Sequence, residues 1–322
     1  MIEIKKLTKT FGRLVAVSDL DLQIASGDIF GFIGPNGAGK TTSMRILVTL
    51  MEPTSGSASI DGLDVTKKGK EVRRRVGYMP DFMGVYDDLK VFEYLEFFAA
   101  AFGIEYRKRK AIVDGVLELT DLVSKQEALV DSLSRGMQQR LGLARVLIHD
   151  PKVLILDEPA SGLDPRARIE MRELLRELKR MGKTIMISSH ILSELEEICD
   201  EIGIIEHGQL VFSGTLEEIR PRLGIQSKVR VKVLGNESRA VELLSVLPQI
   251  QDVELLGAQP PSAGLTPEAG GSTLLVTFKE GANVDGLIAR TLVTGGVDLV
   301  YLQPEQLKLD DAFLQLTKGI VH

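Results

Sequence analysis

The stretch that decides the fold is Gly34-Pro35-Asn36-Gly37-Ala38-Gly39-Lys40-Thr41-Thr42, which follows the apolar run 29–33. It fits the pattern G-x-x-x-x-G-K-T between an expected strand and an expected helix, the context of a phosphate-binding loop rather than of a glycine-rich turn without a ligand. Its glycines let backbone N–H groups turn toward a phosphate, and the start of the following helix favours an anion. Lys40 can reach the β- and γ-phosphates of a nucleotide, and the Thr41 hydroxyl can bind Mg²⁺.

Around this loop, four apolar runs bounded by turn residues predict a parallel sheet: 29–33, 153–156, 184–187 and 202–205. Their residues do not alternate between polar and apolar, which is typical of strands buried on both faces by crossover helices. A helix is expected between the second and third runs, with Asp164 as its N-cap, Pro165 in its first turn and Gly182 as its stop. Strand, helix and strand in this order predict an α/β fold.

Two regions depart from this pattern. Residues 2–7, 16–24 and 58–60 predict short strands of an antiparallel β subdomain. Residues 87–150 predict two helices, 91–102 and 111–122, with no strand run between them. This segment is therefore interpreted as a helical insertion in the α/β core.

The run 153–156 ends in Asp157-Glu158. Ligands of open α/β sheets bind beyond the carboxyl ends of the strands. Asp157 would hold Mg²⁺ through its water shell, and Glu158 could orient and deprotonate the water that attacks a γ-phosphate. A solvated strand end is the alternative interpretation of this dipeptide alone, but its pairing with the loop 34–42 favours nucleotide hydrolysis.

A second domain is expected over residues 224–322, after a first domain over 1–223. Its pattern predicts strands and helices in the order β-α-β-β-α-β, at 228–234, 239–247, 252–256, 273–278, 283–293 and 297–302. This order matches a ferredoxin-like α+β module. The Gly-, Pro- and Ser-rich segment 257–272 predicts its central loop, and a last helix is expected at 309–316.

Composition excludes several classes of protein. The 322 residues are 44% hydrophobic and 26% charged, which is ample for buried cores, and the net charge of −6 gives no basic field for nucleic acid. The single cysteine, Cys199, excludes an intrachain disulfide framework and suits a reducing compartment. The first residues lack the apolar core of a signal peptide, and no run of about 20 apolar residues is present to span a membrane.

Five motifs in order give a more specific resemblance. Leu133-Ser134-Arg135-Gly136-Met137-Gln138-Gln139-Arg140-Leu141 resembles the signature of ATP-binding-cassette (ABC) ATPases, and it precedes Asp157-Glu158 as in that family. Ser161-Gly162-Leu163-Asp164-Pro165 resembles the family's D-loop, and His190 resembles its switch histidine. Phe11 lies where the family stacks an aromatic ring on adenine. The C-terminal module, with residues 309–317, resembles the accessory domain of drug-export ABC ATPases.

The resemblance implies ATP and Mg²⁺ as ligands and a homodimer that closes head to tail around two nucleotides. Each ATP would lie between the phosphate-binding loop of one copy and Ser134, Arg135 and Gly136 of the other, with Asp164 linking the two sites. Lys40, Glu158 and His190 would act on the γ-phosphate and the attacking water. Residues 34–42 and Phe11 would hold the nucleotide, and Thr41 and Asp157 the metal.

Two positions depart from the family pattern. Asp81 follows Tyr78-Met79-Pro80 where the family usually has Gln. Asp81 could meet Mg²⁺ or the water, or it could merely start a turn. Arg135 replaces the usual first glycine of the signature, and it could either face the opposite phosphate or point to solvent.

The resulting prediction is an ATPase subunit that powers export through a separate membrane permease, peripheral on the cytoplasmic face of the membrane, with no nucleic-acid partner. The insertion around residues 81–102 would contact that permease. Two alternatives stay open from the sequence: a soluble ABC ATPase that acts on the ribosome or DNA, and a weakly hydrolysing nucleotide sensor.

Overall fold

The computed structural model describes residues 1–82, 84, 88–222, 228–257, 271–279 and 286–304. The chain forms two compact units, Met1–Leu216 and Glu217–His322, and each is described by itself. No helix in these described ranges is long and apolar enough to cross a bilayer.

A six-stranded sheet forms the centre of the first unit, in the order β10-β9-β3-β8-β7-β6. Its strands are β3 (Ile29–Ile33), β6 (Val76–Met79), β7 (Val153–Leu156), β8 (Thr184–Ser189), β9 (Glu201–Glu206) and β10 (Gln209–Gly214). All neighbours pair in parallel except β10, which forms a hairpin with β9. Every residue of β3, β7 and β8 is buried, as the unbroken apolar runs predict. The carboxyl ends of β3, β7 and β8 therefore meet at one edge.

An antiparallel sheet covers one side of this unit, as expected from residues 2–60. Its order is β2-β1-β4-β5, with β1 (Ile2–Phe11), β2 (Leu14–Ile24), β4 (Ser55–Ile60) and β5 (Leu63–Asp64). Its apolar face shares one core with α1 (Lys40–Leu47) and β3. α2 (Gly69–Arg73) follows β5 and leads into β6.

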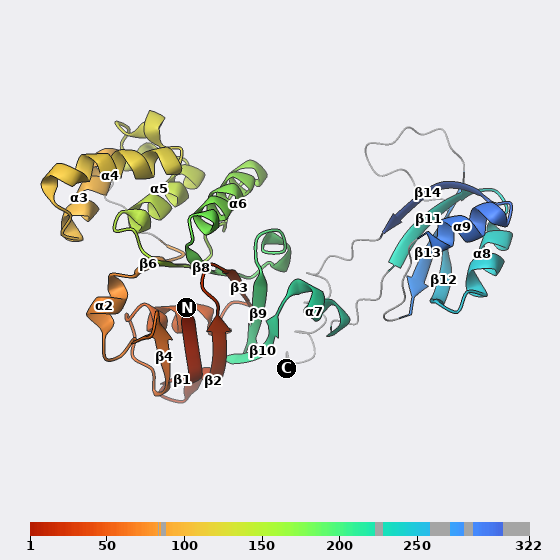
Figure 1. Ribbon diagram of the computed structural model, residues 1–322, viewed down its shortest axis with the longest axis horizontal. Helices are drawn as coiled ribbons and strands as arrows, with labels where there is room; N and C mark the ends of the chain where they lie inside the picture. The colour runs from red at the N-terminus through yellow and green to blue at the C-terminus, as the bar shows by residue number, and fades with distance from the viewer. Residues whose placement is uncertain (83, 85–87, 223–227, 258–270, 280–285, 305–322) are drawn as a thin grey trace. The chain divides into compact units, whose positions relative to one another are not determined.

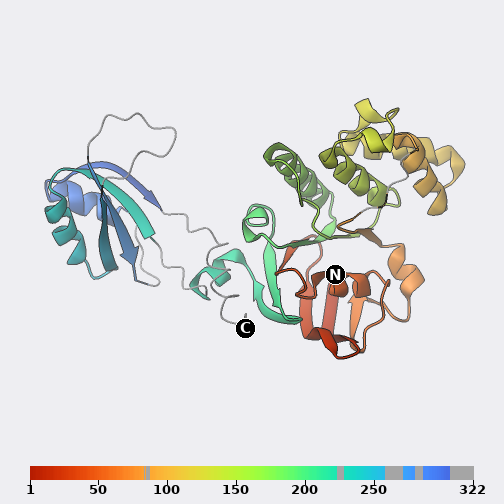
Figure 2. The ribbon, with the colours of Figure 1, turned by 180° about the vertical axis from the view of Figure 1, so that it is seen from behind.

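The helical insertion lies on the opposite side of the unit, where α3, α4 and α5 pack together (Figures 1 and 2). Their bounds are α3 (Val91–Ala101), α4 (Tyr106–Leu119) and α5 (Arg135–Leu147), with single 3₁₀ turns at Val123–Lys125 and Val130–Ser132. α4 begins five residues before the predicted start at 111. Its first turn is charged and exposed, so it carries no apolar periodicity that the sequence could reveal.

α6 (Pro165–Arg180) connects β7 to β8. Asp164 caps it by accepting a hydrogen bond from Ala167 N at 2.9 Å, and its buried stripe is Met171, Leu174, Leu175 and Leu178. A 3₁₀ turn at Leu192–Glu194 follows β8, and α7 (Leu216–Arg222) follows β10. The predicted N-cap Asp164, first-turn proline Pro165 and stop at Gly182 of α6 are confirmed.

The second unit has the predicted β-α-β-β-α-β order. Its elements are β11 (Lys228–Leu234), α8 (Glu237–Ser245), β12 (Ile250–Gly257), β13 (Ser272–Phe278), α9 (Leu287–Thr294) and β14 (Asp298–Pro304). The sheet is antiparallel in the order β12-β13-β11-β14, and both helices pack on a separate core. Most of the predicted central loop lies outside the described residues. The predicted helix 309–316 lies entirely outside them.

Candidate functional site

The loop between β3 and α1 forms a nest of backbone N–H groups. Gly39 has φ 107°, a conformation that other residues rarely adopt, and a Cβ at this position would collide with the carbonyl oxygen of Ala16. Lys40 folds back over the loop, where Nζ donates to Gly34 O at 2.5 Å and to Pro35 O at 3.3 Å. The loop is thereby held in a concave form that suits an anion.

The Lys40 ammonium is buried, with only 6% of its side chain exposed. Burial lowers the pKa of Lys40 from its ordinary value, while the carboxylates of Glu158 and Asp157 oppose that shift. Nζ lies 3.7 Å from Glu158 Oε1. A positive charge thus stands at the floor of the nest, next to two acidic side chains.

Ser188, at the end of β8, organises the acidic pair. Its Oγ donates to Asp157 Oδ1 at 2.6 Å and accepts from Glu158 N at 2.9 Å. On its other side, Asp157 Oδ2 accepts from Thr41 Oγ1 at 2.8 Å. Sequence reasoning did not single out Ser188, although the parallel pairing of β7 with β8 places its position beside Asp157.

Glu158 joins the nest to His190. Its φ of 51° lies in the left-handed region. For a residue other than glycine this conformation costs about 1–3 kcal/mol, and it persists only where surrounding contacts compensate for the strain. The hydrogen bond from its N–H to Ser188 supplies such support. Its Oε2 lies 2.9 Å from His190 Nδ1, and its Oε1 is buried with no hydrogen-bond partner in the described structure. Apart from the ion pair with Lys40 at 3.7 Å, Oε1 can therefore still accept a hydrogen bond from a water molecule.

A cavity of about 300 Å³ opens above the nest. The predicted residues that line it are Phe11, Pro35, Asn36, Gly37, Ala38, Gly39, Lys40, Thr41, Thr42, Asp81, Asp157 and Glu158. Leu14 and Ala16 of β2 also line it, and no sequence motif marks these two residues. Phe11 is 46% exposed at the end of β1, with Lys9 Nζ 5.2 Å from its ring centroid. An exposed aromatic ring beside a phosphate nest suits a nucleoside triphosphate.

The donors present fit a magnesium ion. Thr41 supplies a hydroxyl and Asp157 a carboxylate at one point of the cavity wall, and Asp81 is exposed on the same wall. The described residues hold no group of three or more His, Cys, Asp or Glu side chains that could bind a metal unaided. Mg²⁺ usually keeps several waters and takes one or two carboxylates together with substrate phosphates, so this small donor set is appropriate.

The predicted signature residues lie elsewhere. Ser134 caps α5, with its Oγ accepting from Met137 N at 3.4 Å, and Gly136 packs beside Ala167 in the first turn of α6. Within one chain, Ser134, Arg135, Gly136 and Asp164 do not line the cavity of the phosphate-binding loop. Two groups of predicted site residues are therefore separate in a single copy.

Arg135 has a neighbour that the sequence did not predict. Gly162 has φ 66°, and a Cβ at this position would collide with the Arg135 guanidinium. The sequence left two positions open for this side chain, toward the opposite phosphate or toward solvent. In a single chain it instead lies against the backbone of the D-loop at Gly162. Gly162 leaves the space that the guanidinium occupies.

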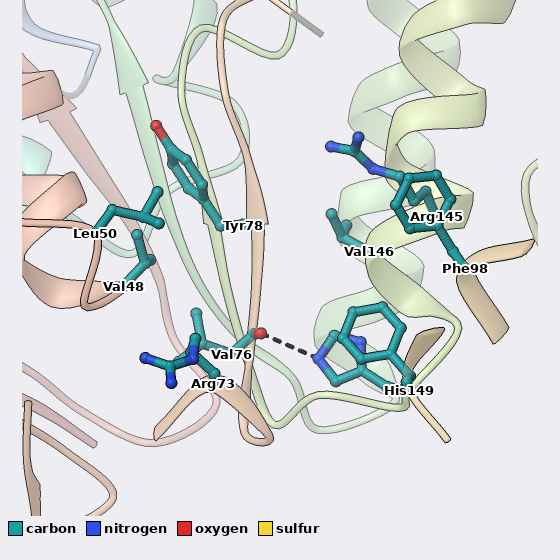
Figure 3. Close-up of a pocket in the computed structure, with 10 residues that line it drawn as sticks. Val48, Leu50, Arg73, Val76, Tyr78, Phe98, Arg145, Val146 and His149 are labelled. Atoms are coloured by element: carbon teal, nitrogen blue, oxygen red, sulfur yellow. Dashed lines mark hydrogen bonds between the residues drawn. The ribbon is translucent and has the colours of Figure 1, made fainter. Parts of the chain in front are cut away.

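A second cavity, of about 240 Å³, lies between β6 and the helical insertion (Figure 3). Val48, Leu50 and Tyr78 form one side of it, and Phe98 and Arg145 the other, and Phe102 also lines it. His149 Nε2 lies 3.0 Å from Val76 O, and its ring stacks on Phe102 with centroids 4.0 Å apart. His149 lies in the turn that follows α5, and these two contacts join β6 to the end of α3.

Comparison with known proteins agrees with this geometry. The family model described as ABC transporter matches residues 17–161. The bacitracin transport ATP-binding protein of Bacillus licheniformis is 36% identical over 320 residues, covering 99% of this chain and 98% of that protein. The Nod factor export ATP-binding protein I of Burkholderia pseudomallei strain K96243 is 37% identical over 316 residues, covering 98% and 96%.

Solved structures give the same result for the first unit. An ATP-binding subunit of an ABC transporter matches with a TM-score of 0.63 and 30% identity, over 70% of this chain and 94% of that one. A dimeric bacterial ABC transporter cassette matches with a TM-score of 0.62 and 25% identity, over 67% and 99%.

Proposed function

The chain belongs to the ABC transporter family of ATPases, and from this premise we propose that it powers export through a separate membrane permease by closing head to tail with a second copy around ATP. The observation that carries the proposal is that Lys40, Thr41, Asp157 and Glu158 are joined by contacts at one cavity, with His190 bound to Glu158 behind them.

Each residue of this set has a separate task. The nest and Lys40 bind the phosphates, and Phe11 stacks on the base. Glu158 orients the attacking water through Oε1 and takes its proton, while His190 holds the other carboxylate oxygen, Oε2, and contacts the γ-phosphate. The buried environment strengthens these interactions because little water screens them.

Thr41 and Asp157 would hold Mg²⁺, with Asp81 beside them. The ion would supply positive charge that offsets the negative charge developing during hydrolysis. Ser188 fixes the Asp157 carboxylate from the other side, so that one of its oxygens stays turned toward Thr41.

A second copy explains why the signature residues lie apart from the nest. Ser134 and Gly136 begin α5, where the unpaired N–H groups and the helix dipole favour an anion. In a head-to-tail pair, this helix start would cap the phosphate held by the other copy, and Asp164 would link the two sites. ATP would then act through its higher affinity for the closed state.

Exposed aromatic residues on the helical side support a permease contact. Phe82 is 86% exposed, and Phe97 and Phe102 are about half exposed on or beside α3. Exposed apolar side chains of this kind are common where a protein contacts a partner. The transport role rests on both relatives, whose names describe bacitracin transport and Nod factor export, and the export direction rests on the second of them. With such a permease, the protein would act at the cytoplasmic face of the membrane.

The composite site is tested by mixing two inactive variants. Lys40→Ala removes the ammonium group from the phosphate-binding loop but leaves the start of α5 intact. Ser134→Arg blocks the start of α5 but leaves the phosphate-binding loop intact. A mixed dimer then contains one intact composite site, so the mixture should regain up to about a quarter of wild-type Mg²⁺-dependent ATPase activity, because half of the dimers are mixed and half of their sites intact.

Gel filtration with ATP is measured on the same mixture, because a half-intact dimer can form without fast turnover. If neither ATPase activity nor an ATP-dependent dimer returns on mixing, while each variant stays folded, the site is not shared between copies. Co-purification of the full chain from membranes, with its partner identified by mass spectrometry, tests the permease.

A further inference from the structure

We infer that Arg168 and Glu194 are positioning residues that tie the D-loop, residues 161–165, to the turn that carries His190. The inference rests on the proposed function, since it concerns how the D-loop influences hydrolysis. Neither residue touches the nucleotide cavity, and neither belongs to the motifs from which the site was predicted.

The first link joins α6 to the D-loop. Arg168 lies in the first turn of α6, and its Nε donates to Leu163 O at 3.0 Å. Leu163 is buried, with 6% of its surface exposed, so this carbonyl belongs to the packed base of the loop. Asp164 beside it caps the same helix through Ala167 N. Arg168 therefore fixes the D-loop on the helix from which it emerges.

The second link crosses from α6 to the segment after β8. Arg168 Nη1 lies 3.3 Å from Glu194 Oε1, and the Glu194 side chain is only 13% exposed. One guanidinium thus serves the D-loop carbonyl and the carboxylate together, which its planar fork of donors allows. Charge-assisted contacts of this kind are stronger than those between neutral groups.

The third link reaches the turn of His190. Glu194 Oε2 lies 3.1 Å from the hydroxyl of Ser189, which is buried. The same hydroxyl accepts from Ile191 N at 3.0 Å, so it holds the backbone on both sides of His190. The imidazole itself is 43% exposed and lies 2.9 Å from Glu158. Its position depends on the backbone that Ser189 fixes.

These links form one path from the D-loop to the base of hydrolysis: Leu163, Arg168, Glu194, Ser189, His190 and Glu158. The D-loop is the segment that a second copy would contact. When that contact moves or fixes Leu163, Arg168 and Glu194 carry the change to His190. Loss of either residue should therefore slow the chemical step and spare nucleotide binding.

The same two elements provide a matched control. One turn further along α6, Arg172 pairs with Glu197, which lies three residues after Glu194. This pair also joins α6 to the segment after β8, but among the described residues no hydrogen bond or ion pair connects either side chain to Leu163 or Ser189. Arg172→Ala removes a comparable ion pair without breaking the path.

The experiment measures kcat and KM for ATP in the full chain, with thermal midpoints for every variant. Arg168→Ala and Glu194→Ala should each lower kcat about 10-fold to 100-fold, as small misplacements of catalytic groups do, while KM changes less than about twofold. For Arg172→Ala, both kcat and KM should stay within about twofold of the wild-type values. The double variant should be no slower than the slower single variant, because both changes break one path.

Arg168→Lys keeps a charge for Glu194 but cannot also reach Leu163 O, so its kcat should fall between wild type and Arg168→Ala. This milder variant serves if the alanine variants do not fold. The inference is overturned if Arg168→Ala loses no more activity than Arg172→Ala, if the two losses multiply, or if higher protein concentration restores the rate. If wild type and Arg172→Ala both fail to hydrolyse ATP, the proposed function fails instead.

Discussion

Glu158 illustrates how a single residue is prepared for its task. Its left-handed backbone turns the carboxylate back over the nest, toward Lys40 and His190. Such a conformation persists only where the surroundings fix it, and here Ser188 does so through the backbone N–H. The strained residue is thus held by a neighbouring strand rather than by its own.

Replacement of Glu158 by Gln tests its role as the base. The amide preserves the size of the side chain but cannot accept a proton, so kcat should fall by at least about 100-fold. Binding of ATP should remain, and the protein should accumulate as an ATP-bound dimer on gel filtration. Wild-type turnover in Glu158→Gln would assign the base to another residue.

Gly162 tests the contact of the D-loop with Arg135. Alanine there has to adopt a positive φ, which costs about 1–2 kcal/mol, and its methyl group collides with the guanidinium. Gly162→Ala should therefore lower the free energy of unfolding more than Gly182→Ala, a position with φ 82° and nothing within 4 Å of the added Cβ. Denaturant unfolding measures both.

Adding Arg135→Gly to Gly162→Ala removes the collision but leaves the backbone strain. The double variant should then resemble Gly182→Ala in its loss of stability. Equal losses in Gly162→Ala and Gly182→Ala would mean that the guanidinium moves aside without cost, and that Arg135 does not hold the D-loop.

At the scale of elements, the buried strands were predictable and the links between them were not. The run 153–156 is identical to β7 because a strand buried on both faces needs an unbroken apolar run. The start of α4 was missed because its first turn faces solvent. Ser188 and Glu194 act through partners 31 and 26 residues away in sequence, which no local pattern reveals.

His149 links β6 to the helical insertion, and this link should weaken in acid. Nε2 donates to Val76 O, whereas Nδ1 is buried without a partner in the described structure. Burial lowers the pKa of His149 below its ordinary value of about 6.5. Between that value and the lower folded pKa, the unfolded chain binds more protons, so stability falls as pH falls through this window.

The measurement compares thermal midpoints at pH 8 and pH 5.5. His149→Gln cannot gain this proton, so its midpoint should fall less on acidification than that of wild type, although it starts lower because the stacking on Phe102 is lost. His207→Asn removes an exposed imidazole, so the thermal midpoint of this variant should fall on acidification by as much as that of wild type. Equal shifts in all three proteins would show that His149 remains neutral or is solvated when charged.

For the whole molecule, the two separate cores predict two unfolding events. Phe30 lies in the core of the first unit and Phe278 in that of the second, and both are fully buried. The nucleotide cavity lies in the first unit. ATP with Mg²⁺ should therefore raise the temperature of the calorimetric transition of the first unit and leave that of the second unit unchanged. Phe278→Ala should lower the free energy of unfolding of the second unit by about 3–5 kcal/mol without altering the affinity for ATP.

Phe30→Ala is the matched change in the other core, and it should lower the transition that responds to ATP. If Phe278→Ala weakens ATP binding more than about fivefold, a difference of about 1 kcal/mol, the second unit contributes to the nucleotide site. If ATP raises both transitions together, the two units unfold as one. With neither result, nucleotide binding does not depend on the stability of the second unit.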